Sequence, residues 1–135
     1  MLTTLFHPPI VHFPVALWLT SGVFDVLAWR RADPMFRRAA YWLVGLGLMA
    51  AAASIAAGWV DLLRLEREGV GAALRQRHLL HSQLAYAATF VYALNFAWRR
   101  RTQNAPAPWL LALSFLGAVL IGTTAYLGGA LRGVM

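Results

Sequence analysis

Four long apolar stretches, separated by short segments rich in arginine, constrain this chain more than any other feature of its sequence. The stretches cover residues 10–29, 39–60, 79–98 and 108–131. A helix needs about 20 mostly apolar residues to cross the hydrocarbon core of a bilayer. Only 13% of the residues are charged, whereas about a quarter are charged in soluble proteins. The sequence therefore predicts a single domain, residues 1–135, that is an all-α integral membrane protein with a four-helix transmembrane bundle.

The arginines predict how this bundle is oriented in the membrane. Seven of them follow the first and third stretches: Arg30, Arg31, Arg37, Arg38, Arg99, Arg100 and Arg101. Five fall on the opposite side: Arg64, Arg67, Arg75, Arg77 and Arg132. Because loops rich in positive charge stay on the inner side of a membrane, we expect both termini on the outer side. The same clustering beside apolar stretches is typical of membrane flanks, so we expect no nucleic-acid partner despite a net charge of +7.

The first stretch is expected to remain in the mature protein. A cleaved signal peptide carries basic residues before its apolar run. Here Arg30 and Arg31 follow the run, and no basic residue precedes it.

His12 and His81 occupy matching places in an apparent internal repeat. Each is followed 17 residues later by Trp-Arg-Arg, which begins at Trp29 and at Trp98, so the two segments are offset by 69 residues. We interpret this repeat as two duplicated helical hairpins related by a pseudo-twofold axis along the membrane normal. That symmetry would place His12 and His81 at equal depth on facing helices, near the outer boundary.

All four histidines, His7, His12, His78 and His81, are expected on the outer side of the bilayer. An ionisable side chain within a membrane span is costly and marks a functional site by default. Neutral imidazole is also a common ligand for transition metals and haem. The chain has no cysteine, which excludes cysteine-ligated clusters and covalent haem attachment. We therefore predict a small membrane cytochrome that transfers electrons, with His12 and His81 as axial ligands of haem b and His7 and His78 as further cofactor contacts.

Two other classes of protein explain the same histidines. They can form structural hydrogen bonds between helices in a non-catalytic scaffold or accessory subunit, or they can bind a divalent zinc or copper ion. The sequence holds no motif for a catalytic nucleophile or a phosphate loop. No catalytic residue is assigned, and an electron-transfer or binding protein is expected before an enzyme. The cytochrome hypothesis implies a redox partner or a quinone, and a homo-oligomer is a further expectation.

Asp25 is the one acidic residue of the first stretch and lies about one turn before Trp29. We expect it to form an ion pair with Arg37 or Arg38 at the inner interface. Asn95 occupies nearly the same depth in the third stretch, and we expect it to bond to Asp25 between helices.

Several of these segments together resemble one family of bacterial membrane proteins, catalogued as domain of unknown function 2231. They are the opening HPPIVHFPVAL, Asp25, a histidine at the start of the third stretch, WRRR at its end and the closing LGGAL. The resemblance implies four membrane helices, a multi-pass location in the bacterial inner membrane and an association with redox modules, which favours electron transfer. Many members end in G-G-x-L-V-Y-x-H-G-V-G-V, whereas this chain ends LGGALRGVM and lacks the tail histidine. The matching positions are His7, Pro8, His12, Phe13, Pro14, Asp25 and His81.

Overall fold

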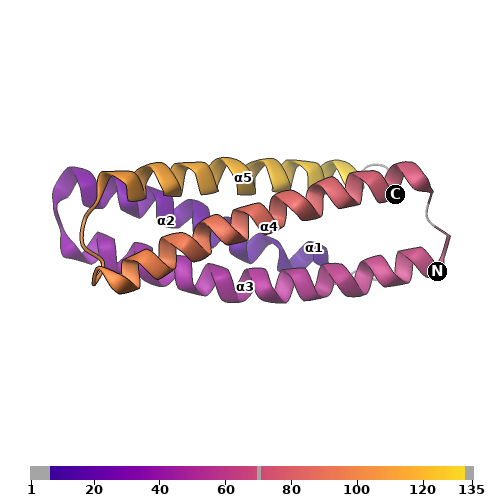
Figure 1. Cartoon of the computed structure of the whole chain (residues 1–135), viewed down its shortest axis with the longest axis horizontal. Coiled ribbons are helices and arrows are strands. Elements are labelled where there is room, and N and C mark those ends of the chain that lie inside the picture. The colour runs from indigo at the N-terminus through magenta and orange to yellow at the C-terminus, as the bar shows by residue number, and fades with distance from the viewer. Residues whose placement is uncertain (1–6, 70, 133–135) are drawn as a thin grey trace.

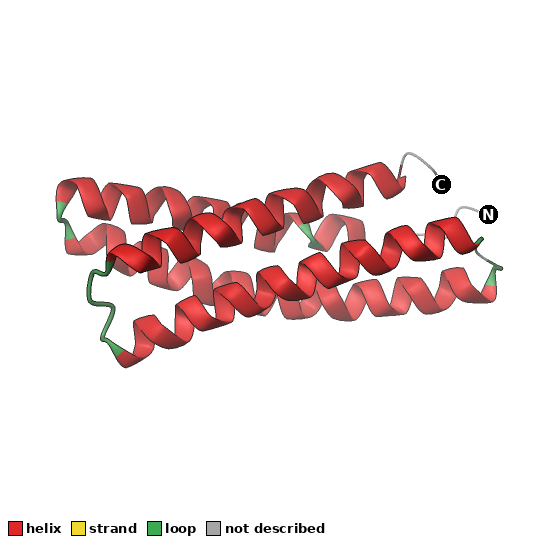
Figure 2. Ribbon diagram, turned by 45° about the horizontal axis from the view of Figure 1, so that its top comes forward, coloured by secondary structure: helices red, strands yellow, loops and turns green. Residues whose placement is uncertain are grey.

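The chain folds into a bundle of long antiparallel helices (Figures 1 and 2). The computed structural model describes residues 7–69 and 71–132, and within these ranges there are helices and short links but no strand. The predicted all-α fold class is thus confirmed. The helices are α1 (His7–Ile10), α2 (His12–Arg31), α3 (Pro34–Arg67), α4 (Ala72–Arg101) and α5 (Pro108–Arg132).

The two ends of the bundle differ in chemistry. The α2–α3 and α4–α5 connections lie side by side at one end, which we call the arginine-rich end (Figure 1). The link between α3 and α4 lies at the other, together with the start of α1 and the end of α5, and we call this the histidine end. At the arginine-rich end α2 stops at Ala32, which has a left-handed φ of 51°. Asp33 then caps α3, since its Oδ1 accepts a hydrogen bond of 2.8 Å from Met35 N.

Prolines shape the start of the first long helix. α1 begins at His7, and Pro8 and Pro9 occupy its first turn, where a missing N–H costs little. Pro14 cannot donate to the carbonyl of Ile10, and the helix is interrupted at Val11, between α1 and α2.

Helices α2 and α4 lie on one diagonal of the bundle, because each packs against α3 and α5. Their side chains meet in the centre, where the rings of Trp18 and Tyr92 stack with centroids 4.2 Å apart. Val44, Ala51 and Ile121 complete the buried core around this pair. Gly47 and Gly117 make the packing possible, since a Cβ on Gly47 would overlap the Trp18 ring and a Cβ on Gly117 would lie 2.8 Å from Tyr92 Cε2.

The two hairpins repeat the same pattern of buried positions. An offset of 74 residues relates α2 to α4, and an offset of 70 relates α3 to α5. The bundle is therefore built from two hairpins around a pseudo-twofold axis. In the first register the pairs are Pro14 and Ala88, Trp18 and Tyr92, Ser21 and Asn95, and Asp25 and Arg99. In the second they are Ala40 and Leu110, Val44 and Ser114, Gly47 and Gly117, Ala51 and Ile121, and Ser54 and Thr124.

This register corrects the 69-residue offset expected from the sequence. At an offset of 74 the equivalent of His81 is His7, and His12 falls opposite Tyr86. The identities at offset 69 include Thr20, Trp29 and Trp98, which are exposed. Those residues lie on the outside of the bundle, whereas the structural repeat is defined by the residues that pack inside it.

Within residues 7–69 and 71–132, three helical segments are long and apolar enough to cross a membrane by length and composition, namely His7–Arg31, Pro34–Arg67 and Pro108–Ala130. α4 is as long as its neighbours but less apolar, because its buried face carries His81, Asn95 and Arg99. Large apolar side chains cover the outside of the bundle, including Met49 and Phe115, which are both 72% exposed. Such a surface is suited to contact with lipid rather than water.

Candidate functional site

The imidazole of His7 is fixed between α1 and α3. Its Nδ1 lies 2.7 Å from the main-chain oxygen of Ser54. Because a carbonyl only accepts, Nδ1 donates in this contact, and Nε2 is the ring nitrogen left for another partner. The backbone N–H of His7 donates to Asp61 Oδ2 over 2.8 Å, so a side chain of α3 caps the start of α1. A Cβ on Gly58 would lie 3.2 Å from His7 Nδ1.

His81 repeats this arrangement in the second hairpin. Its Nδ1 lies 3.0 Å from the main-chain oxygen of Thr124, and its side chain is buried. Gly128 lies against the ring, since a Cβ there would be 3.0 Å from Cε1. Thr124 and Gly128 are the equivalents of Ser54 and Gly58, so both imidazoles are held in the same tautomer by equivalent helices.

The two rings lie close together in a T-shaped arrangement at the histidine end. The centroids of His7 and His81 are 5.8 Å apart and the ring planes are 85° from parallel. Cavities lie on both sides of the pair. One of about 310 Å³ lies between α3 and α4, and one of about 190 Å³ lies between α2 and α5. His7, Gly58, His78 and His81 line both.

The other two predicted histidines take different places. The ring centroid of His78 is 6.3 Å from that of His81, and its Nδ1 is 3.3 Å from Ser82 Oγ. Half-burial lowers the pKa of His78 below the ordinary value of an imidazole. His12 is exposed and lines the rim of the smaller cavity. The structure thus pairs His81 with His7, with His78 beside them and His12 further out. A ligand role for His12 stays a prediction.

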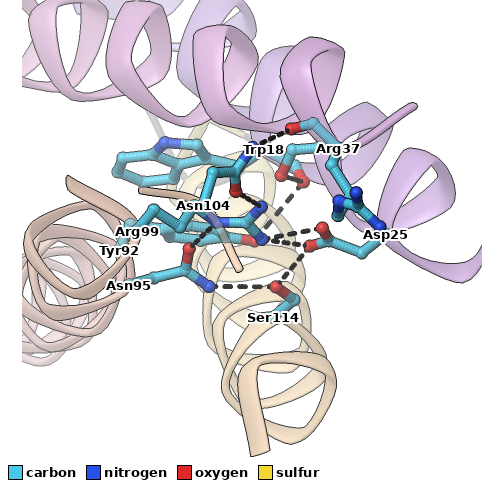
Figure 3. Close-up of polar contacts among 9 residues, drawn as sticks. Trp18, Asp25, Arg37, Tyr92, Asn95, Arg99, Asn104 and Ser114 are labelled. Atoms are coloured by element: carbon cyan, nitrogen blue, oxygen red, sulfur yellow. Dashed lines mark hydrogen bonds and ion pairs between the residues drawn. The ribbon is translucent and has the colours of Figure 1, made fainter. Parts of the chain in front are cut away.

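A second polar cluster lies near the arginine-rich end and is almost wholly buried (Figure 3). Arg99 Nη2 donates to both carboxylate oxygens of Asp25 over 2.7 Å. Ser114 Oγ donates to Asp25 Oδ2, also over 2.7 Å. Asn95 accepts from Arg99 Nε over 2.6 Å and donates to Ser114 over 3.0 Å. Arg99 Nη1 reaches Asn104 Oδ1 at 3.3 Å, so the cluster links α2, α4, α5 and the α4–α5 connection.

This cluster corrects the partners expected for Asp25. The carboxylate pairs with Arg99 across the bundle diagonal rather than with Arg37 or Arg38. Asn95 joins the network through Arg99 and Ser114. The sequence placed Arg99 in a cytoplasmic flank, yet only 2% of its side chain is exposed. A charge this deep is stable because every polar atom of the pair has a partner.

Sequence reasoning missed the residues that hold the two histidines. Ser54 and Thr124 contribute main-chain oxygens, which leave no chemical signature in a sequence. Gly58 and Gly128 did carry a signal, because each glycine lies four residues after the residue whose main-chain carbonyl accepts the histidine hydrogen bond. The structure offers two ring nitrogens here, and among residues 7–69 and 71–132 no group of three or more His, Cys, Asp or Glu is placed to hold a metal ion.

Comparison with known protein families gives one match. The family described as Predicted membrane protein (DUF2231) matches residues 4–134, nearly the entire chain. The chain belongs to this family. No curated protein and no solved structure matches it.

The DUF2231 positions recognised in the sequence divide between the two ends of the bundle. His7 and His81 form the ring pair at the histidine end, and Asp25 anchors the ion pair at the other. Pro14 is buried, whereas Phe13 is 64% exposed. The tail in which this DUF2231 member lacks a histidine, Gly133–Met135, lies outside the described residues.

Proposed function

We propose that this protein is a small membrane cytochrome in which His7 and His81 supply the two axial nitrogens of a haem b. The observation that supports this most is the paired tautomer: each Nδ1–H is held by a main-chain carbonyl, which leaves each Nε2 available as a metal ligand. Metal-ligating histidines commonly show this second-shell hydrogen bond. The proposal keeps His81 from the sequence-based hypothesis and replaces His12 by His7.

The spacing of the rings agrees with one metal atom between them. Two imidazoles that held one metal between them through their ring nitrogens would have centroids about 6 Å apart. The observed separation is 5.8 Å. Two imidazoles suit haem iron, because the porphyrin provides the other four nitrogens, whereas structural zinc takes four protein ligands. The cavities on both sides of the pair provide room for a flat macrocycle.

The chain's part in electron transfer would be to hold and orient the ligands. A bound haem b supplies one-electron redox chemistry at its iron. The carbonyls of Ser54 and Thr124 fix the ring orientations and increase the basicity of each Nε2. Electron transfer also requires a donor and an acceptor, and a redox protein or a quinone dissolved in the bilayer would serve.

The visible absorption spectrum of the purified protein tests the proposal. Protein from haem-replete cells should be red with a sharp Soret band. His7→Ala and His81→Ala should each lose at least 90% of the band, while His12→Ala should retain it. Adding imidazole to His81→Gly should restore part of the band, which separates a lost ligand from a lost fold. Colourless wild-type protein, or loss of the band only in His12→Ala, would overturn the assignment.

A second candidate function is a non-catalytic scaffold or accessory subunit. It is favoured by the two histidine–carbonyl bonds, which tie α1 to α3 and α4 to α5. In that case the histidine variants would lose stability without losing any pigment. Elemental analysis of the same preparation would detect zinc or copper, the third candidate. Gel filtration would test for a homo-oligomer.

We also propose that the histidine end faces the outside of a bacterial inner membrane. Support comes from the arginines at the opposite end, of which six remain after Arg99 is assigned to the ion pair with Asp25. A periplasmic reporter fused after Met135 should be active, and a fluorescent protein that folds only in the cytoplasm should stay dark. The reverse result would invert the orientation.

A further inference from the structure

A cavity of about 250 Å³ opens at the arginine-rich end, between the two interhelical connections. Trp29, Ala32 and Arg37 line it from the α2–α3 side, and residues 104–107 line it from the α4–α5 side. Leu110 and Leu111 form part of its wall. The cavity is separate from the histidine site, which lies at the other end of the bundle (Figure 1).

The buried Asp25–Arg99 pair forms part of the wall of this cavity. The two groups offset each other, because Arg99 Nη2 contacts both oxygens of Asp25 and Ser114 donates to the same carboxylate. Asp25 therefore does not make the cavity acidic. The cation that lines the cavity in addition to this pair is Arg37.

Arg37 is held in place by the opposite connection. Asn104 Nδ2 donates to the main-chain oxygen of Arg37 over 2.8 Å, and Asn104 Oδ1 accepts from Arg99. One asparagine thus ties the backbone of Arg37 to the buried ion pair (Figure 3). This link holds the main chain at Arg37, in the first turns of α3, against the α4–α5 connection.

The surrounding charge is strongly positive. Five further arginines belong to the same end of the chain, against one acid besides Asp25, the partly buried Asp33. They are Arg30, Arg31, Arg38, Arg100 and Arg101. The walls beside Arg37 are apolar, and Trp29 is 55% exposed, as suits an aromatic side chain at a membrane interface. Positive charge beside an apolar wall at the edge of a bilayer suits a ligand with an anionic head and an acyl tail.

We propose that this cavity binds the phosphate headgroup of an anionic glycerophospholipid, with Arg37 as its main cationic contact. Basic pockets between transmembrane helices are suited to such headgroups. The acyl chains would leave along the apolar wall formed by Leu110 and Leu111 into the bilayer. The proposal is independent of haem binding, since no residue is shared between the two sites.

Lipid retention tests the proposal. The full chain is reconstituted in nanodiscs of phosphatidylcholine with 20% phosphatidylglycerol, extracted in mild detergent, and its retained lipid is counted by native mass spectrometry. We expect phosphatidylglycerol to be enriched at least fivefold over its share of the bilayer. Arg37→Gln should abolish the enrichment, Arg37→Lys should keep part of it, and Arg38→Gln, on the same turn but outside the cavity lining, should keep it.

Three results would overturn the proposal. Equal losses in Arg37→Gln and Arg38→Gln would show general attraction to a basic surface. Equal retention of both lipids would show that the headgroup charge is not recognised. Displacement of the lipid by millimolar inorganic phosphate would assign the site to a free anion instead. Circular dichroism and gel filtration of each variant separate loss of the site from loss of the fold.

Discussion

The rings of Trp18 and Tyr92 stack across the bundle diagonal, with centroids 4.2 Å apart and planes 13° from parallel. Each aromatic ring lies against a glycine of a facing helix, Gly47 for Trp18 and Gly117 for Tyr92. Trp18 also donates from Nε1 to the main-chain oxygen of Val44 over 3.3 Å. The stack therefore joins all four long helices at the midpoint between the two polar clusters.

Replacing Gly47 by alanine should destabilise the bundle. The new methyl group would overlap the indole of Trp18, and overpacking of this kind costs about 1–3 kcal/mol. Gly22→Ala is the matched control, because a Cβ there meets nothing within 4 Å and alanine favours a helix over glycine. The free energy of unfolding in detergent measures both. Equal stability of Gly47→Ala and wild type would show that the stack can shift at no cost.

Removing one partner of the buried ion pair should destabilise more than removing both. Asp25→Asn leaves Arg99 without its counter-charge, which we expect to cost about 3–5 kcal/mol. Adding Arg99→Gln to that variant should recover part of the loss. Arg100→Gln, on an exposed neighbour, should stay within about 0.5 kcal/mol of wild type. A double variant whose loss equals the sum of the two single losses would mean that the pair is not coupled.

Gly128→Ala should reduce the haem content of the protein while leaving it folded. Its methyl group would lie 3.0 Å from His81 Cε1, so the ring would have to shift from its observed position. The expected readout is a Soret band lowered at least threefold per mole of protein. Gly122→Ala on the same helix adds a methyl group in open space and should bind haem as wild type does. Full haem binding by Gly128→Ala would argue against His81 as a ligand.

A pair of reciprocal substitutions tests the helix ends. Ala32 ends α2 with a left-handed φ of 51°, and Gly69 follows α3 with a φ of 81°. Glycine adopts this conformation without steric cost, whereas alanine adopts it only with a steric clash of its Cβ. Ala32→Gly should therefore raise the free energy of unfolding by about 0.5–1 kcal/mol, and Gly69→Ala should lower it by a similar amount. A lower melting temperature for Ala32→Gly, or a higher one for Gly69→Ala, would refute this account.

Hydropathy and arginine placement were sufficient to predict the helical bundle and its connections. Each predicted stretch lies within a helical segment, and the helices run further, since α3 extends to Arg67 and α4 begins at Ala72. Hydropathy indicates which part of a helix contacts lipid. The helix itself continues beyond that part as long as its backbone N–H and C=O groups remain hydrogen-bonded to each other. The Pro8-Pro9 pair disfavours a helix at His7 by sequence, yet α1 begins at His7, because proline is tolerated in a first helical turn.

The contacts of the candidate site depend on packing, which the sequence alone does not display. His7 meets His81 because α1 and α4 place them at equivalent positions, five residues away from the register that Trp29 and Trp98 suggested. In the sequence, Arg99 is one of three consecutive arginines that follow the third apolar stretch, and nothing there separates it from Arg100 and Arg101. Arg99 is buried because it lies on the face of α4 that points across the bundle to Asp25 on α2. Which face of α4 points inward depends on how the helices pack and not on the neighbouring residues in the sequence.

Asp25 and Arg99 occupy equivalent places in the two hairpins yet carry opposite charges. Two copies of the first hairpin, assembled in the same way, would bury carboxylate against carboxylate, and two copies of the second would bury guanidinium against guanidinium. Each half is thus matched to the other and mismatched to itself. If the hairpins were produced as separate polypeptides, each should assemble with the other and not with a second copy of itself. This one ion pair therefore makes the association of the two halves specific.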